Sequence, residues 1–118
     1  MTVYNYLSSY AIRTFPDYGY GEDAVWGIDW DSTYSSPVGN VKHIKVPSLF
    51  VGMTAGWEYL ASEAIYGHSA ARDKQLAFVE GANHKFYPEK SRESYPGQFG
   101  DTMKTLHDYA DKWLEEHF

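Results

Sequence analysis

The sequence predicts an α/β fold whose centre is a strand–helix–strand–helix unit. Two short apolar runs, residues 46–52 and 75–80, have the length and the bounding residues of buried strands. Between these runs and after them, apolar residues recur at the three- and four-residue spacing of an α-helix. Strands joined by such a helix pair in parallel through a right-handed crossover. We therefore expect a βαβα unit with two parallel strands, a crossover helix and a C-terminal amphipathic helix.

The first 40 residues show weak periodicity and are rich in aromatic residues, glycine, serine and aspartate. Residues 3–13 are predicted to form one short helix, because several of their apolar side chains fall on one face. Pro16 then breaks the helix. Residues 18–40 are predicted to form an extended loop. Long loops in compact domains usually carry function or belong to a larger assembly.

The expected elements of the C-terminal part follow one another closely. After the first strand, a turn at Thr54-Ala55-Gly56 leads into a crossover helix over residues 59–72. The second strand is followed by a loop over residues 81–97 and then by a helix over residues 98–116. Apolar residues at helical spacing predict this last helix: Phe99, Met103, Leu106, Ala110, Trp113 and Leu114.

Composition and charge narrow the classes of function. A chain of 118 residues suggests a single domain, with residues 1–40 as a lid-like aromatic segment and residues 41–118 as the core. The net charge of −6 argues against binding to nucleic acid or to an anionic membrane surface. No run approaches the ~20 apolar residues of a membrane span, and residues 1–6 do not resemble a signal peptide, so we expect a cytoplasmic protein. The absence of cysteine excludes disulfides and thiolate chemistry.

The predicted sheet is too small to be stable by itself. Parallel sheets need cover on both faces and more than two strands. We therefore expect a homodimer, or a partner chain, that completes the sheet; strands from the first 40 residues are the alternative.

A histidine follows the second predicted strand at the place where chemistry gathers in parallel sheets. The apolar run ends at Glu80-Gly81, and His84 comes three residues later, at the carboxyl edge of the strands. Its function there would be that of a general base; the alternative is a loop histidine with no partner. Glu58 is the only carboxylate in the loop over residues 53–59, which follows the first strand. Glu58 is the candidate to orient the His84 ring, and the alternative is a glutamate placed to favour the start of a helix.

Three motifs in residues 41–118 together resemble the C-terminal end of an α/β-hydrolase. They are the strand entry Ile44-Lys45-Val46-Pro47, the loop Gly81-Ala82-Asn83-His84, and the closing helix that ends in Trp113-Leu114. The resemblance implies a serine hydrolase acting on ester or amide bonds, with His84 as the catalytic histidine. It also implies that Glu58 stands where the family usually has an aspartate.

The nucleophile of that family is not in this sequence. The Gly-x-Ser-x-Gly elbow lies between a strand and a helix and precedes the acid and the histidine. The nearest match, Gly67-His68-Ser69-Ala70-Ala71, lacks the closing glycine and follows a predicted helix rather than a strand, so it is interpreted as a helix face. The resemblance thus implies the last part of a larger hydrolase, not catalytic alone. The alternative is a non-catalytic oligomeric binding or assembly protein with an aromatic small-molecule or sugar site.

Tryptophans supply the candidate residues for such a site. Trp26, Trp30 and Trp57 are the candidate substrate-binding residues, and carboxylates surround the first two. The alternative is a lid packed on the core, or a subunit interface rich in tyrosine and tryptophan. The histidines share no metal-ligand spacing, so we expect neither a metal nor another cofactor.

Overall fold

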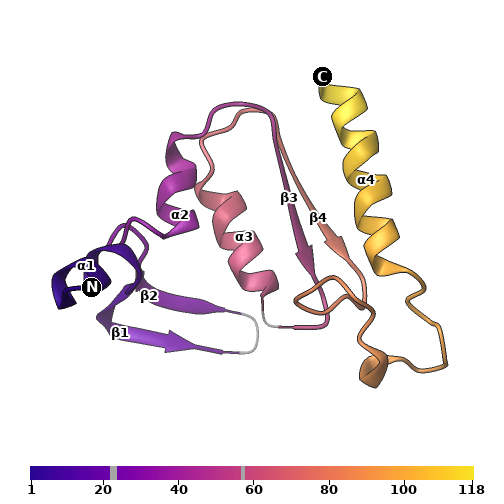
Figure 1. Ribbon diagram of the computed structural model, residues 1–118, viewed down its shortest axis with the longest axis horizontal. Coiled ribbons are helices and arrows are strands. Elements are labelled where there is room, and N and C mark those ends of the chain that lie inside the picture. Colours follow the sequence, from indigo (N-terminus) through magenta and orange to yellow (C-terminus); the bar gives the residue numbers. More distant parts are fainter. Residues whose placement is uncertain (22–23, 57) are drawn as a thin grey trace.

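The protein contains both helices and strands in a computed structural model, which describes residues 1–21, 24–56 and 58–118. The strands form two separate pairs, one antiparallel and one parallel. The expected α/β class is therefore confirmed in its coarse form, with a parallel two-stranded sheet. Figure 1 shows the antiparallel pair near the N-terminus and the parallel pair in the middle of the molecule.

The parallel pair is formed by β3 (Ser48–Met53) and β4 (Lys74–Val79), close to the predicted strands. The pairing runs in register from Ser48 opposite Lys74 to Met53 opposite Val79. Both strands therefore end at one edge of the sheet, and the loops that follow them start side by side.

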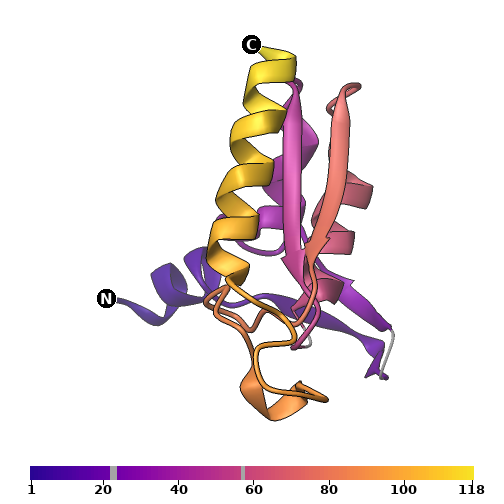
Figure 2. The same cartoon turned by 90° about the vertical axis from the view of Figure 1, so that its right-hand side faces the viewer.

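Two helices cover the two faces of this small sheet. The crossover helix α3 (Tyr59–His68) packs on one face, and α4 (Thr102–His117) packs on the other (Figure 2). A small buried cluster of Met53, Val79 and Ala82 lies at the carboxyl end of the strands. The core thus lies directly beneath the two loops, and it limits how far their first residues can move.

Both helices are shorter than the sequence pattern suggested. The predicted crossover helix reached residue 72, but α3 ends at His68, where the extended backbone of Ser69 stops it. The closing helix was predicted from residue 98, but α4 begins at Thr102 because Asp101 is its N-cap. The Asp101 carboxylate accepts a hydrogen bond from the Lys104 N–H at 2.9 Å.

The prediction for the N-terminal segment was wrong in two places. The first helix, α1 (Val3–Ser9), stops early, and the expected loop contains a hairpin of β1 (Arg13–Tyr20) and β2 (Val25–Asp29). A short helix, α2 (Pro37–Asn40), and a 3-10 turn, η1 (Val41–His43), lead to β3.

The hairpin escaped prediction because β1 buries almost nothing. Seven of its eight residues are exposed, so no alternation of apolar and polar residues is required. Pro16 lies inside β1, where an edge strand tolerates a residue without an N–H, and the pairing is irregular between Thr14 and Gly19. The Gly21 N–H donates to the Ala24 carbonyl at 2.8 Å, next to the paired residues Tyr20 and Val25.

None of the helices in the described ranges is both long enough and apolar enough to cross a bilayer.

Candidate functional site

Three hydrogen bonds join the loop after β3 to the last residue of β4 and to the loop that follows it. The Thr54 N–H donates to the Val79 carbonyl at 3.3 Å, and the Gly81 N–H donates to the Thr54 hydroxyl at 2.8 Å. One residue further, the Ala55 N–H donates to the Ala82 carbonyl at 3.0 Å. The two loops are therefore held together from their first residues, before either reaches its candidate catalytic side chain.

Asn83 shapes the turn that carries the histidine. Its side-chain oxygen accepts hydrogen bonds from the Lys85 N–H at 3.0 Å and the Tyr87 N–H at 3.3 Å. Its own N–H donates to the Tyr87 carbonyl at 2.8 Å. Asparagine commonly stabilises such turns by bonding to the backbone two residues on. Asn83 therefore has a structural role in presenting His84.

The structure brings the two candidate catalytic residues into contact. His84 Nδ1 lies 3.2 Å from Glu58 Oε1. The Glu58 side chain is mostly buried at 19% exposure, whereas the His84 side chain is 75% exposed. Glu58 is the N-cap residue of α3, but its carboxylate makes no capping hydrogen bond to the helix. The carboxylate therefore faces the imidazole rather than the amino end of the helix.

The second carboxylate oxygen of Glu58 is buried and has no hydrogen-bond partner among the described residues. Gly56 makes room for it, because a Cβ at position 56 would collide with Glu58 Oε2. Leaving a buried carboxylate oxygen without a hydrogen-bond partner costs free energy. Native structures contain few such atoms, and a catalytic role is one of the reasons for which they occur.

A carboxylate beside Nδ1 favours the tautomer that carries its proton there. Nε2 is then left with a lone pair that can accept a proton. Among the described side chains, no serine hydroxyl forms a hydrogen bond with the His84 ring. Ser69, predicted to lie on a helix face, in fact lies past the end of α3, and its buried hydroxyl accepts from the Ala71 N–H at 3.2 Å.

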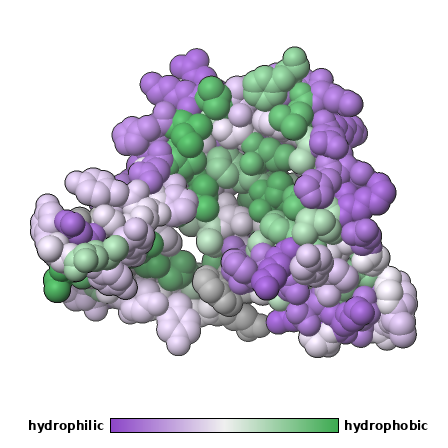
Figure 3. Space-filling model, viewed as in Figure 1, coloured by the Kyte–Doolittle hydropathy of each residue, from purple (hydrophilic) through white to green (hydrophobic). Residues whose placement is uncertain are grey.

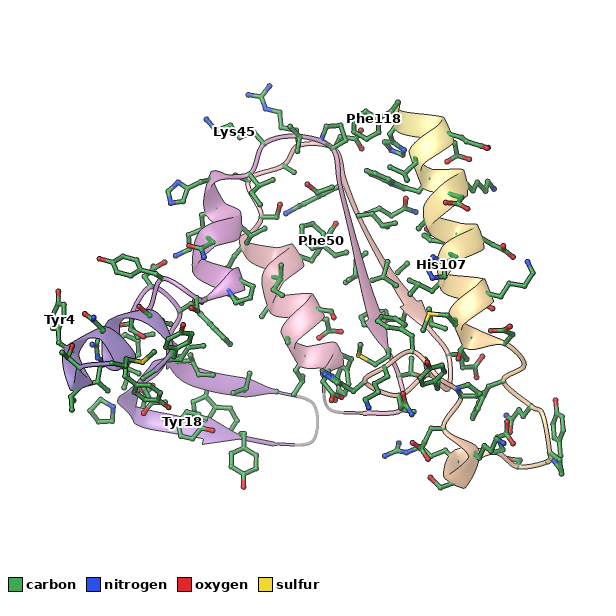
Figure 4. The ribbon with its side chains drawn as sticks, viewed as in Figure 1. Tyr4, Tyr18, Lys45, Phe50, His107 and Phe118 are labelled. Atoms are coloured by element: carbon green, nitrogen blue, oxygen red, sulfur yellow. The ribbon has the colours of Figure 1, made fainter. Side chains whose placement is uncertain are left out.

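A cavity of about 760 Å³ lies beside these loops, between the β1–β2 hairpin and the amino end of α3. Figure 3 shows the surface hollowed there, and Figure 4 shows Tyr18 on the hairpin. Most of the lining is apolar or aromatic, and it includes Tyr18, Val25, Ile28, Trp30, Tyr59 and Leu60.

The three candidate substrate-binding tryptophans have different positions. Trp30 lines the cavity. Trp26 does not line it: its ring packs over Gly19 of the neighbouring strand, and the residue is 50% exposed. Trp57 lies outside the described residues.

Arg92 is a lining residue that the sequence did not indicate. It ends a 3-10 turn, η2 (Lys90–Arg92), whose N-cap is Glu89. The Ser91 hydroxyl donates to Glu89 Oε1 at 2.6 Å, and this bond lowers the pKa of the Glu89 carboxyl, with a smaller contribution from the charge of Arg92. No spacing rule connects Arg92 with the hairpin, since only the path of the loop after β4 brings them together.

Within residues 1–21, 24–56 and 58–118, no group of three or more histidine, aspartate or glutamate side chains could hold a metal ion. Comparisons of the chain with protein-family models, curated proteins and solved structures found no match.

Proposed function

We propose that Glu58 and His84 are the acid and the base of a hydrolase-like site for ester or amide bonds. The hydroxyl nucleophile comes from another segment or another chain. The observation that supports this proposal most directly is the 3.2 Å contact between His84 Nδ1 and Glu58 Oε1. It joins residues on two loops that leave one edge of a parallel sheet, where ligands bind in α/β folds.

The two side chains have different roles in this proposal. Glu58 holds the imidazole in one orientation and stabilises the imidazolium that forms when a proton is transferred. His84 accepts the nucleophile's proton at Nε2 and later donates it to the leaving group. The high exposure of the ring suits this role, because a hydroxyl from outside these two loops can reach it. A base without a nucleophile gives no acyl transfer, so the described residues are one part of a complete site.

The orientation of the ring can be tested without any substrate. Long-range ¹⁵N NMR spectra of neutral His84 should show the proton on Nδ1 in the wild-type protein. In Glu58→Ala the proton should move to Nε2, which free imidazole side chains prefer in water. Glu63→Ala is the matched control, since Glu63 is an exposed glutamate of α3, and it should leave the tautomer unchanged. The same tautomer in wild type and Glu58→Ala would refute the role of Glu58.

The reactivity of the ring can be tested with an activated ester. An accessible, unprotonated imidazole nitrogen attacks p-nitrophenyl acetate even where no serine is present. We expect His84→Ala to remove most of the second-order rate of the wild-type protein. We expect His43→Ala, which alters another exposed histidine, to leave the rate unchanged. Equal losses in the two variants would count against a reactive His84.

The open sheet favours a second candidate function, assembly with another chain. Among the described strands, β3 and β4 pair only with each other, so each leaves an outer edge unpaired. Figure 3 shows hydrophobic surface over the middle of the molecule, and Figure 4 places Phe50 of β3 in that region. Exposed edges pair readily with further strands. Light scattering tests this function, and a monomer at every concentration would contradict a homodimer.

A further inference from the structure

The cavity between the β1–β2 hairpin and α3 is, we infer, a binding site for a small apolar molecule that carries an aromatic ring and one carboxylate. An arylalkanoic acid is the simplest example. The inference concerns binding and goes beyond the proposed chemistry of Glu58 and His84. It rests on the shape and lining of the cavity and on one cation at its wall.

The size and the lining of the cavity suit an apolar ring. Its volume of about 760 Å³ falls within the range of roughly 300–1,000 Å³ that is usual for small-molecule sites. Ile28 of the hairpin and Leu60 of α3 provide aliphatic surface, and Tyr18 and Trp30 provide ring faces. Aromatic ligands pack favourably on such faces in offset or edge-on geometry.

The positive charge of Arg92 indicates that the ligand carries a negative charge. It is the only charged residue among the described residues that line the cavity. Its side chain is exposed and makes no hydrogen bond or ion pair with the other described side chains. The nearby Glu89 carboxylate, which feels the charge of Arg92, is itself bonded to the Ser91 hydroxyl. The guanidinium is thus available to donate two parallel hydrogen bonds to the two oxygens of a ligand carboxylate.

The position of the cavity connects it to the proposed catalytic pair. Thr54 and Gly56, which precede Glu58 in the same loop, line the cavity. His84 does not line it. A bound molecule therefore lies next to the loop that holds the carboxylate, and its binding does not require the imidazole. The proposed ligand binding and the proposed catalytic role can consequently be tested independently of each other.

A matched pair of probes tests the inference on the intact protein. We would titrate ¹⁵N-labelled protein with 4-phenylbutyrate and with its neutral analogue 4-phenylbutyramide, following the amide shifts by NMR. The carboxylate should bind about tenfold more tightly than the amide, since hydrogen bonds to charged groups are the stronger kind. The largest shifts should fall on Ile28, Trp30 and Leu60. Equal affinity for the two probes, shifts that fall elsewhere, or no binding of either probe at millimolar concentration would overturn the inference.

Four variants assign the effect to individual residues. Arg92→Gln should lower the affinity for the carboxylate to that of the amide. Arg72→Gln, an exposed arginine just before β4, should change neither affinity. Ile28→Asp should abolish both, and the wild-type comparison of the two probes remains decisive if this variant does not fold. Full preference for the carboxylate in Arg92→Gln would overturn the inference. Unchanged affinity in His84→Ala would separate this site from the proposed catalytic pair.

Discussion

Gly81 provides the sharpest test of how the histidine loop is built, through the substitution Gly81→Ala. The residue is buried and has a φ of +68°, a conformation that costs an L-residue about 1–2 kcal/mol. A Cβ there would also collide with the ring of Phe99, which lies against the glycine. Displacing a packed ring costs about 1–3 kcal/mol. We therefore expect Gly81→Ala to lower the free energy of unfolding by about 2–5 kcal/mol.

Gly97→Ala separates the two contributions to this loss. Gly97 has a similar φ of +78°, but no described atom outside its chain neighbours lies within 4 Å of the position that a Cβ would take. Its replacement should therefore cost only the conformational part, about 1–2 kcal/mol. Urea denaturation followed by circular dichroism measures both variants. Equal losses would refute the reasoning, because the Phe99 ring would then not occupy the space above Gly81.

Three further predictions concern other parts of the chain. Thr102→Val removes the hydrogen bond that its buried hydroxyl donates to the Phe86 carbonyl at 2.6 Å, and urea denaturation should show a loss of about 1–3 kcal/mol. Gly67→Ala, at a position in α3 where a Cβ would meet no described atom within 4 Å, should raise stability by about 0.5–1 kcal/mol in the same assay. The pKa of Glu89 is lowered from 4.5 in the folded protein, so its stabilising effect is present above that pH and is lost as the pH falls through the folded value. Ser91→Ala should raise this pKa toward 4.5, and a ¹³C NMR titration of the carboxyl carbon would contradict the account if the pKa stayed the same.

The sequence was informative where burial dictates residue type. β3 and β4 lie between two helices, so their apolar runs were readable as strands, and the order of the elements placed Glu58 and His84 on neighbouring loops. The hairpin gave no such signal, because β1 is exposed on nearly every residue. Arg92 was missed for a different reason: the path of a long loop brings it to the cavity, and local spacing does not encode that path.

The double hydrogen bonding of Thr54 has a consequence for how this site tolerates change. Its N–H donates to Val79, the last residue of β4, and its hydroxyl accepts from the Gly81 N–H, so the start of the loop that carries His84 is anchored by a threonine that performs no chemistry itself. Serine at this position would keep both bonds, whereas valine would keep the backbone bond to Val79 and lose the bond from Gly81, which loosens the start of the histidine loop without altering Glu58 or His84.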